Sequence, residues 1–260
     1  MDDDSYEMLI KLNLEKVRLL RLSEIEDARL LAVKPTRTPV EYCWMFSSSL
    51  PLWLLEKNPL LDMITYLDAD LYFYASLEPI YEEFGHSSIM IIPHGFPENN
   101  KWQEKTRGIY NVGMTIFRND VNGLAALRWW KDRVIEWCFD RYENGKFGDQ
   151  LYLNDWTTRF NGVHVLKNPG ANVASWNIEA FRCSQARLIF YHFHGLKIYR
   201  SSNGKIRAYP STVHDCLIYK PYLQVMEGAY QSISVPQPGW SFGLAKKLDI
   251  FRIIKQYIGL

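Results

Sequence analysis

The chain has 260 residues, of which 47% are hydrophobic and 15% aromatic, and its 30 Lys and Arg nearly balance its 29 Asp and Glu. This composition excludes an intrinsically disordered protein, and it lacks the basic excess that nucleic-acid binders carry, so no nucleic-acid partner is expected. The length allows one or two domains with a substantial core.

The first third of the chain predicts short helices that lead into one buried strand. Residues 5–12 and 23–32 have helical patterns, with a strand candidate at 17–22 between them, and residues 39–56 form a longer helical pattern. The run Met63–Leu67 is apolar, β-branched and aromatic and is bounded by polar residues, which is typical of a buried strand.

Strand and helix patterns alternate in the rest of the chain and indicate an α/β architecture. Asn119 or Asp120 is a suitable N-cap for a helix that runs to about Tyr142. The polar stretch 98–105 predicts a loop, and the C-terminal third is predicted to be helical with a loop at 236–239. The further strand candidates are residues 87–92, 112–117, 163–166 and 188–193, with a short helix at 149–156.

Cysteine usage and the termini bear on location. The cysteines are widely spaced and form no Cys-x-x-Cys pair, which argues against a structural zinc site and a disulfide scaffold and favours a reducing cytosol. The acidic start Met1-Asp2-Asp3-Asp4 does not resemble a secretory signal, and no segment reaches the ~20 apolar residues of a spanning helix. We therefore expect a cytoplasmic protein. The cysteines are Cys43, Cys138, Cys183 and Cys216.

Asp68 and Asp70 are the most informative residues, because they follow the strand at i and i+2. In an extended chain such residues point to the same side, and ligands of open α/β sheets bind beyond the carboxyl ends of strands. Both carboxylates can then face one hard divalent cation, which prefers oxygen ligands and is often shared with substrate phosphates. The pair indicates an enzyme that handles a nucleotide diphosphate, although an isolated Asp-x-Asp is also common as a solvated strand end.

Three further polar clusters follow along the chain, and each has a structural reading beside a functional one. In Asn111-Val112-Gly113 the amide can satisfy backbone groups of a turn and the glycine can allow a close approach. In Gly148-Asp149-Gln150 the carboxylate can be a helix N-cap. The third cluster, His192-Phe193-His194-Gly195-Leu196-Lys197, contains a histidine that can equally be a buried core residue.

In this order the four motifs resemble the metal-dependent glycosyltransferases of the GT-A fold, most closely glycosyltransferase family 8, which includes glycogenin and bacterial lipopolysaccharide galactosyltransferases. The family pattern is Asp-x-Asp, Asn-x-Gly, Asp-Gln and His-Phe-x-Gly followed by a Lys, and the resemblance covers residues 39–197. It implies a Rossmann-like mixed sheet flanked by helices. We expect a catalytic domain at 1–210 and a helical C-terminal extension at 211–260.

The resemblance implies a metal site and a donor site. Asp70 would bind Mn²⁺ or Mg²⁺ directly, and Asp68 would bind the metal or the ribose of the nucleotide. His192 matches the family's late metal ligand, and His194, which shares a strand face with it, is an alternative.

Other residues would surround the sugar and the diphosphate. Asn111, beside Gly113, and Asp149 would hydrogen-bond hydroxyls of the transferred sugar, with Gln150 near the reacting face. Lys197, after Gly195, would contact the diphosphate. Because only Leu196 separates Gly195 from Lys197 where the family has two residues, Lys205 or Arg200 are alternatives. A Trp176-Asn177 pair resembles a family Trp-Asn near the sugar, and a core Trp with a turn Asn is an equal reading.

The implied activity is transfer of a sugar from a nucleotide sugar, with a UDP-sugar expected, to a saccharide or lipid-linked acceptor in polysaccharide biosynthesis, with retention of configuration. One alternative is a haloacid-dehalogenase-type phosphatase with Asp68 as nucleophile, although Tyr72 stands where that class has Thr or Val. A second is a transferase-like binding protein with impaired catalysis. The N-terminal segment motivates this second alternative. Only 67 residues precede Asp68, with one good strand candidate before Met63, so the first nucleotide-binding strand is missing, rearranged or replaced.

The last residues, 244–260, contain basic side chains among Leu, Ile and Phe. They predict an amphipathic surface helix, with peripheral contact to an anionic membrane as the alternative. The basic residues are Lys246, Lys247, Arg252 and Lys255.

Overall fold

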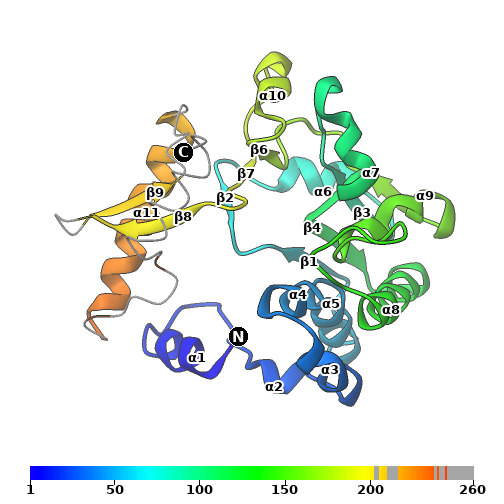
Figure 1. Cartoon of the computed structure of the whole chain (residues 1–260), viewed down its shortest axis with the longest axis horizontal. Helices are drawn as coiled ribbons and strands as arrows, with labels where there is room; N and C mark the ends of the chain where they lie inside the picture. The colour runs from blue at the N-terminus through cyan, green and yellow to red at the C-terminus, as the bar shows by residue number, and fades with distance from the viewer. Residues whose placement is uncertain (202–204, 210–215, 237–238, 240–243, 245–260) are drawn as a thin grey trace. The chain divides into compact units, whose positions relative to one another are not determined.

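The computed structural model describes residues 1–201, 205–209, 216–236, 239 and 244. The chain divides into two compact units. Figure 1 labels the helices and strands of both. One unit is Ile25–Phe193, and the other combines Met1–Glu24 with His194–Leu260. The basic residues predicted to form a surface helix, in 245–260, lie outside the described residues. The domain boundary expected at residue 210 stays a prediction.

The larger unit contains a four-stranded mixed sheet, as expected. Its order is β1-β4-β3-β5, where β1 and β3 run antiparallel to β4, and β5 runs parallel to β3. The four strands confirm the strand predictions to within two residues at each end. Their bounds are β1 Met63–Leu67, β3 Ile89–Pro93, β4 Tyr110–Arg118 and β5 Val163–Val165.

Helices cover both faces of this sheet, which explains why β3 and β4 are buried along nearly their whole length. Neighbouring residues of β4 point to opposite faces. Ile116 packs in a core with Phe84 of α6 (Glu78–Phe84), whereas the ring of Phe117 meets Trp130 of α8 (Val121–Glu136) and Trp156 of α9 (Trp156–Arg159).

A second sheet of the same unit decides where the aspartates lie. It has the order β2-β7-β6, with β2 (Leu71–Phe73) antiparallel and β6 (Val173–Ala174) parallel to β7 (Phe190–His192). The chain therefore leaves the first sheet after β1 and enters the second sheet at β2. Asp68–Asp70 form the turn between the two sheets, so the same-side geometry expected for an extended strand does not apply.

Several N-terminal expectations need correction. Residues 23–32 are not one helix but α2 (Leu22–Ile25) and α3 (Ala28–Val33), because Asp27 accepts hydrogen bonds from the N–H groups of Arg29 and Leu30 and so caps a new helix. Residues 17–20 carry no regular structure, so the strand candidate at 17–22 is wrong. The helical pattern at 39–56 is confirmed, as α4 (Pro39–Trp44) and α5 (Phe46–Lys57) with a capping box at Thr38.

Expectations further along the chain are partly right. The predicted loop at 98–105 is helical, with η2 (Glu98–Gln103) and α7 (Glu104–Arg107). The long helix α8 is capped by Asp120 but ends at Glu136 rather than near Tyr142. The short helix at 149–156 is a 3₁₀ helix, η3 (Gln150–Asp155), followed by α9. Shorter helices of this unit are η1 (Lys34–Thr36) and α10 (Ile178–Ser184).

The smaller unit mixes helices with a hairpin. It contains α1 (Asp3–Ile10), the antiparallel pair β8 (Lys197–Arg200) and β9 (Ile206–Tyr209), and α11 (Cys216–Ser234). The expectation of a wholly helical C-terminal third is therefore wrong for the hairpin and right for α11. Among the helices of the described residues, none combines the length and apolar character needed to cross a membrane.

Candidate metal centre and donor site

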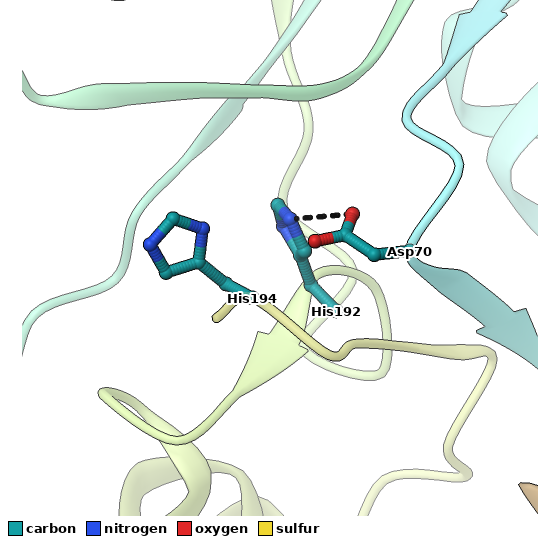
Figure 2. Close-up of side chains that lie close together, drawn as sticks. All are labelled: Asp70, His192 and His194. Atoms are coloured by element: carbon teal, nitrogen blue, oxygen red, sulfur yellow. Dashed lines mark ion pairs between the residues drawn. The ribbon is translucent and has the colours of Figure 1, made fainter. Parts of the chain in front are cut away.

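The turn between the two sheets brings two carboxylates to a buried histidine. The Oδ1 of Asp70 lies 3.1 Å from Nε2 of His192, and Oδ2 of Asp68 lies 3.9 Å from the same nitrogen. Figure 2 shows Asp70 reaching toward the ring from the chain that enters β2. The His192 side chain is 3% exposed, whereas that of Asp70 is 42% exposed. The histidine is thus fixed by packing, and the carboxylate is open to a ligand.

His194 also lies near this pair. One carboxylate oxygen of Asp70 and one ring nitrogen of each histidine all lie within 4.8 Å of one another. The sequence placed both histidines on one strand face, but β7 ends at His192 and His194 lies beyond it. It is exposed and is the first residue past the larger unit, joined to His192 through Phe193.

These three side chains fit a divalent metal. Ligand atoms around one six-coordinate divalent ion stand roughly 3–4.5 Å apart, which matches the spacing of the three groups. Carboxylate suits Mg²⁺ and Mn²⁺, whereas imidazole favours transition metals. The mixed donor set therefore favours Mn²⁺ over Mg²⁺, and any such ion would bring positive charge to the end of β1.

Gly113 makes room for His192. A Cβ atom at this position would stand 2.8 Å from Nδ1 of His192 and 2.7 Å from Oδ1 of Asn111. The N–H of Gly113 donates to that same Oδ1 at 2.9 Å, and its carbonyl accepts the N–H of Asp68 at 2.9 Å. The close-approach reading of this glycine is confirmed, and the backbone of β4 ties the aspartate turn to the histidine.

Gly113→Ala is expected to weaken both the fold and the metal site. The added methyl group must displace the His192 ring or Asn111, at a cost of about 1–3 kcal/mol. Thermal unfolding and titration with Mn²⁺ measure the two effects. Gly228→Ala is the control, because that glycine is exposed on α11 with open space around it. An unchanged Mn²⁺ affinity in Gly113→Ala would contradict the proposed packing.

Asn111 and the Trp176-Asn177 pair have structural contacts in addition to their expected roles. Asn111 is 7% exposed, and its side-chain oxygen accepts from the backbone N–H of Gly113. This oxygen therefore satisfies a backbone group, as the structural interpretation expected. The Trp176 ring packs edge-on against His192 with centroids 5.5 Å apart. Asn177 donates to the carbonyls of His94 and Asn172 and accepts from the N–H of Ala174. Trp176 thus adjoins the candidate metal ligand, whereas Asn177 organises the turn.

Asp149 is fully buried and lies within electrostatic reach of the aspartate turn. Burial raises the pKa of its carboxyl to about 7; a hydrogen bond with Ser47 opposes this shift, and the charge of Asp68 adds to it. Asp149 is the N-cap residue of η3, as the structural reading expected, but its side chain makes no cap hydrogen bond there. The amide of Gln150 donates to the carbonyl of Arg107 at 2.6 Å. An acidic group held mostly neutral below pH 7 is typical of functional sites.

The predicted diphosphate residues belong to the smaller unit. Gly195 has a positive φ of 71° with open space around it, and Lys197 is exposed at the start of β8. Of the alternatives, Arg200 stacks over the ring of Tyr230 at 4.2 Å, and Lys205 is exposed. The assignment among these basic residues stays a prediction.

Two residues of the site were not identified from the sequence. The hydroxyl of Tyr66 donates to Oδ1 of Asp68 at 2.8 Å. Tyr66 precedes Asp68 by two residues, and this spacing was a signal in the sequence that the two side chains could meet. Ser47 contacts Asp149 across 102 positions of sequence, and no local pattern could have revealed it.

Two Bacillus subtilis (strain 168) proteins are similar to the whole chain. YfnF, described as uncharacterized, is 32% identical over 267 residues, which cover 96% of this chain and 87% of YfnF. YfnD, also described as uncharacterized, is 29% identical over 262 residues, which cover 95% of this chain and 84% of YfnD. No protein-family model matches the chain.

Solved structures of glycosyltransferases share part of the architecture. One is involved in glycosylation of the major capsid of PBCV-1 (13% identity, TM-score 0.42, 74% of this chain and 82% of that one). Another is mouse xyloside xylosyltransferase 1 (16%, 0.45, 74% and 81%). A third is the galactosyltransferase LgtC with donor and acceptor sugar analogs (16%, 0.38, 56% and 58%). These TM-scores lie below 0.5, so function must be argued from the residues of the site.

Proposed function

The chain belongs to one family with YfnF of Bacillus subtilis, and we propose that it is a metal-dependent glycosyltransferase of GT-A type that transfers a sugar from a nucleotide sugar. The observation that carries the proposal is the convergence of Asp70 and Asp68 on His192 at the turn between two sheets. Three of the four sequence motifs, Asp-x-Asp, Asn-x-Gly and the histidine motif, meet there. The fourth, Asp149, lies within electrostatic reach.

The chemistry of sugar transfer requires such a site. Breaking a sugar–phosphate bond leaves negative charge on a nucleoside diphosphate. Asp70, His192 and His194 would hold a divalent cation, which would supply positive charge to neutralise it. Tyr66 orients Asp68 through its hydroxyl, and Asp68 would bind the ion or the ribose.

The remaining groups position the sugar. Because the transferred sugar acquires oxocarbenium character by analogy with glycoside hydrolysis, carboxylate oxygens near its hydroxyls stabilise it. Asp149 fits this role, with Gln150 next to it in the chain, and Asn111 contributes its amide N–H groups. Among the exposed basic side chains, Lys197, Arg200 or Lys205 would contact the diphosphate. Orientation of the acceptor hydroxyl supplies much of the rate.

We also propose details of the enzyme class and its substrates. The chain would belong to glycosyltransferase family 8, use a UDP-sugar donor and Mn²⁺, and retain the configuration of the sugar. Its acceptor would be a saccharide or a lipid-linked molecule. A cytoplasmic location with peripheral membrane contact is also proposed rather than observed. The residues that would hold the nucleotide base are not assigned.

The direct test is a donor panel. Purified protein with Mn²⁺ is expected to bind UDP by calorimetry and to hydrolyse or transfer from at least one nucleotide sugar of a panel of UDP-, GDP- and ADP-sugars. Chelation of the metal should abolish both. Neither binding nor turnover across the panel, in a folded sample with Mn²⁺ present, would contradict the proposal.

The same protein samples distinguish the two alternative functions, which are a phosphatase and a binding protein. A phosphatase would need an Asp68 oxygen as nucleophile, and Oδ1 of Asp68 already accepts a hydrogen bond from Tyr66. Turnover of phosphate monoesters that disappears in Asp68→Asn would establish that class. Mn²⁺-dependent nucleotide binding with no turnover of any donor would indicate a binding protein derived from a transferase.

A further inference from the structure

The hydroxyl of Ser47 lies between two oxygen atoms in the interior of the larger unit. Its Oγ is 2.7 Å from the carbonyl oxygen of Trp44 and 2.7 Å from Oδ2 of Asp149. Ser47 is 0% exposed and Asp149 6% exposed, so water does not compete for these contacts. Both distances are typical of hydroxyl hydrogen bonds, in which a proton lies between the two oxygen atoms.

Counting protons fixes how the two contacts are made. A serine hydroxyl has one proton, a carbonyl oxygen can only accept, and an ionised carboxylate can only accept. If Asp149 were charged, one of the two contacts would join two oxygen atoms with no proton between them. If Asp149 is neutral, its own O–H donates to Ser47, and Ser47 donates to the carbonyl of Trp44, so both contacts are hydrogen bonds.

We propose that Ser47 positions Asp149 in two charge states: it accepts the proton of the neutral acid in the donor-free protein, and it turns to donate to the carboxylate when the sugar is bound. The inference rests on the proposed function for the second state only. The first state follows from the donor-free geometry alone.

The surroundings of Asp149 favour the neutral state. The titratable groups whose charge acts on it, or on which its charge acts, are Asp68 after β1, Tyr66 on β1, Cys43 on α4 and Cys138 after α8. All four are acids, and among the described residues none of the groups named in these interactions with Asp149 is a cation. Burial is the largest cause that raises the pKa of Asp149, to about 7.

A bound sugar would reverse this preference. Sugar hydroxyls are hydrogen-bond donors, and a carboxylate accepts from several of them at once, with stronger bonds than a neutral acid makes. The proton of Asp149 would then leave to bulk water, and Ser47 would turn its own proton from the carbonyl of Trp44 to the carboxylate. Near pH 6, binding of the donor would therefore release about one proton per site.

A donor-free titration tests the Ser47 contact. With ¹³C-labelled aspartate, the Asp149 carboxyl is expected to titrate near pH 7, and Ser47→Ala is expected to raise its midpoint by about one pH unit, because the charged form loses the Ser47 hydroxyl as a donor. Ser47→Thr, which keeps the hydroxyl, should return the midpoint toward that of the wild type. A wild-type midpoint near 4 would overturn the proposal, even if Ser47→Ala failed to fold.

Thermal unfolding with a matched control gives an independent readout. Ser49 is also buried on α5, and its hydroxyl donates to the carbonyl of Met45 at 2.8 Å without a carboxylate partner. The melting temperature of Ser47→Ala should fall below that of Ser49→Ala by on the order of 5 °C at pH 8.5 but not at pH 5.5. An equal loss for both variants at both pH values would reduce Ser47 to an ordinary buried serine.

Calorimetry with UDP-glucose and Mn²⁺ at pH 6, in buffers of different ionisation enthalpy, tests the coupling. The wild type should release about one proton more than Asp149→Asn. Binding with equal proton release would overturn the second charge state. Absence of binding would count against the proposed function, and the donor-free titration would still decide the role of Ser47.

Discussion

Asp70→Asn is expected to abolish Mn²⁺-dependent binding of UDP while the protein stays folded. The amide keeps the size of the side chain but removes the negative charge that pairs with His192 and that would bind a divalent ion. We expect Mn²⁺ affinity to fall by about 100-fold or more, and sugar transfer by about 1,000-fold, which corresponds to about 4 kcal/mol of transition-state stabilisation. Because the Asp70 side chain is 42% exposed, the melting temperature should change little.

Asp62→Asn provides the control for this experiment. Asp62 is an exposed carboxylate of the same unit, paired with Arg118 at 2.9 Å on the surface. Its replacement should leave Mn²⁺ and UDP binding at wild-type levels. Calorimetry on both variants at the same ionic strength makes the comparison direct. Full binding by Asp70→Asn would show that the turn between the sheets is not the metal site.

Asp149→Asn is expected to stabilise the fold at high pH and to remove activity. The folded pKa of about 7 lies above the ordinary value of 3.8 for an aspartate, so between these values the unfolded carboxyl loses its proton while the folded one keeps it. The free energy of unfolding of the wild type therefore falls as pH rises through this range and levels off above pH 7. Between pH 5 and pH 8 the loss is about 3 kcal/mol, and the amide does not undergo it.

Melting curves of both proteins measure this effect. The melting temperature of the variant should gain on that of the wild type by roughly 6–12 °C between pH 5 and pH 8. Transfer activity should fall by about 100-fold or more, since an amide cannot replace a carboxylate that accepts from sugar hydroxyls. Parallel pH curves for the two proteins would show that Asp149 does not titrate in the folded state near pH 7.

Asp149 is thus expected to lower the stability of the fold while it serves the proposed transfer activity. A buried acid with no cation among the groups that act on it costs free energy at neutral pH, and a residue selected for stability alone would be apolar or an amide. Ser47 reduces this cost in either charge state, because a hydroxyl can both accept and donate. Because a hydrogen bond to a charged carboxylate is stronger than one to a neutral acid, we expect the Ser47 contact to matter more at pH 8.5 than at pH 5.5.

Local sequence pattern was sufficient for the strands of the main sheet. Met63–Leu67 and Ile89–Pro93 combine β-branched and apolar residues between polar ends, and the hydrogen bonds and packing of a strand follow from such a run. The Asp120 cap of α8 was likewise visible, because an N-cap bonds to groups only three residues away. The break at Asp27 was missed although it is a local N-cap of the same kind, whereas the end of α8 at Glu136 was missed because tertiary context overrides propensity.

The candidate site, like the fold, could be predicted from the sequence only in part. The sequence by itself determined which chemical groups are present and in which order: the Asp68–Asp70 pair, the Gly113 motif, Asp149 and the histidines, which together suit a metal and a diphosphate. Only the tertiary structure decided their geometry. Pairing of β1 with β4 and of β2 with β7 turns Asp70 toward His192, and α5 brings Ser47 to Asp149 from 102 residues away. Such long-range pairings depend on how whole sheets and helices pack, and no short window of sequence contains that information.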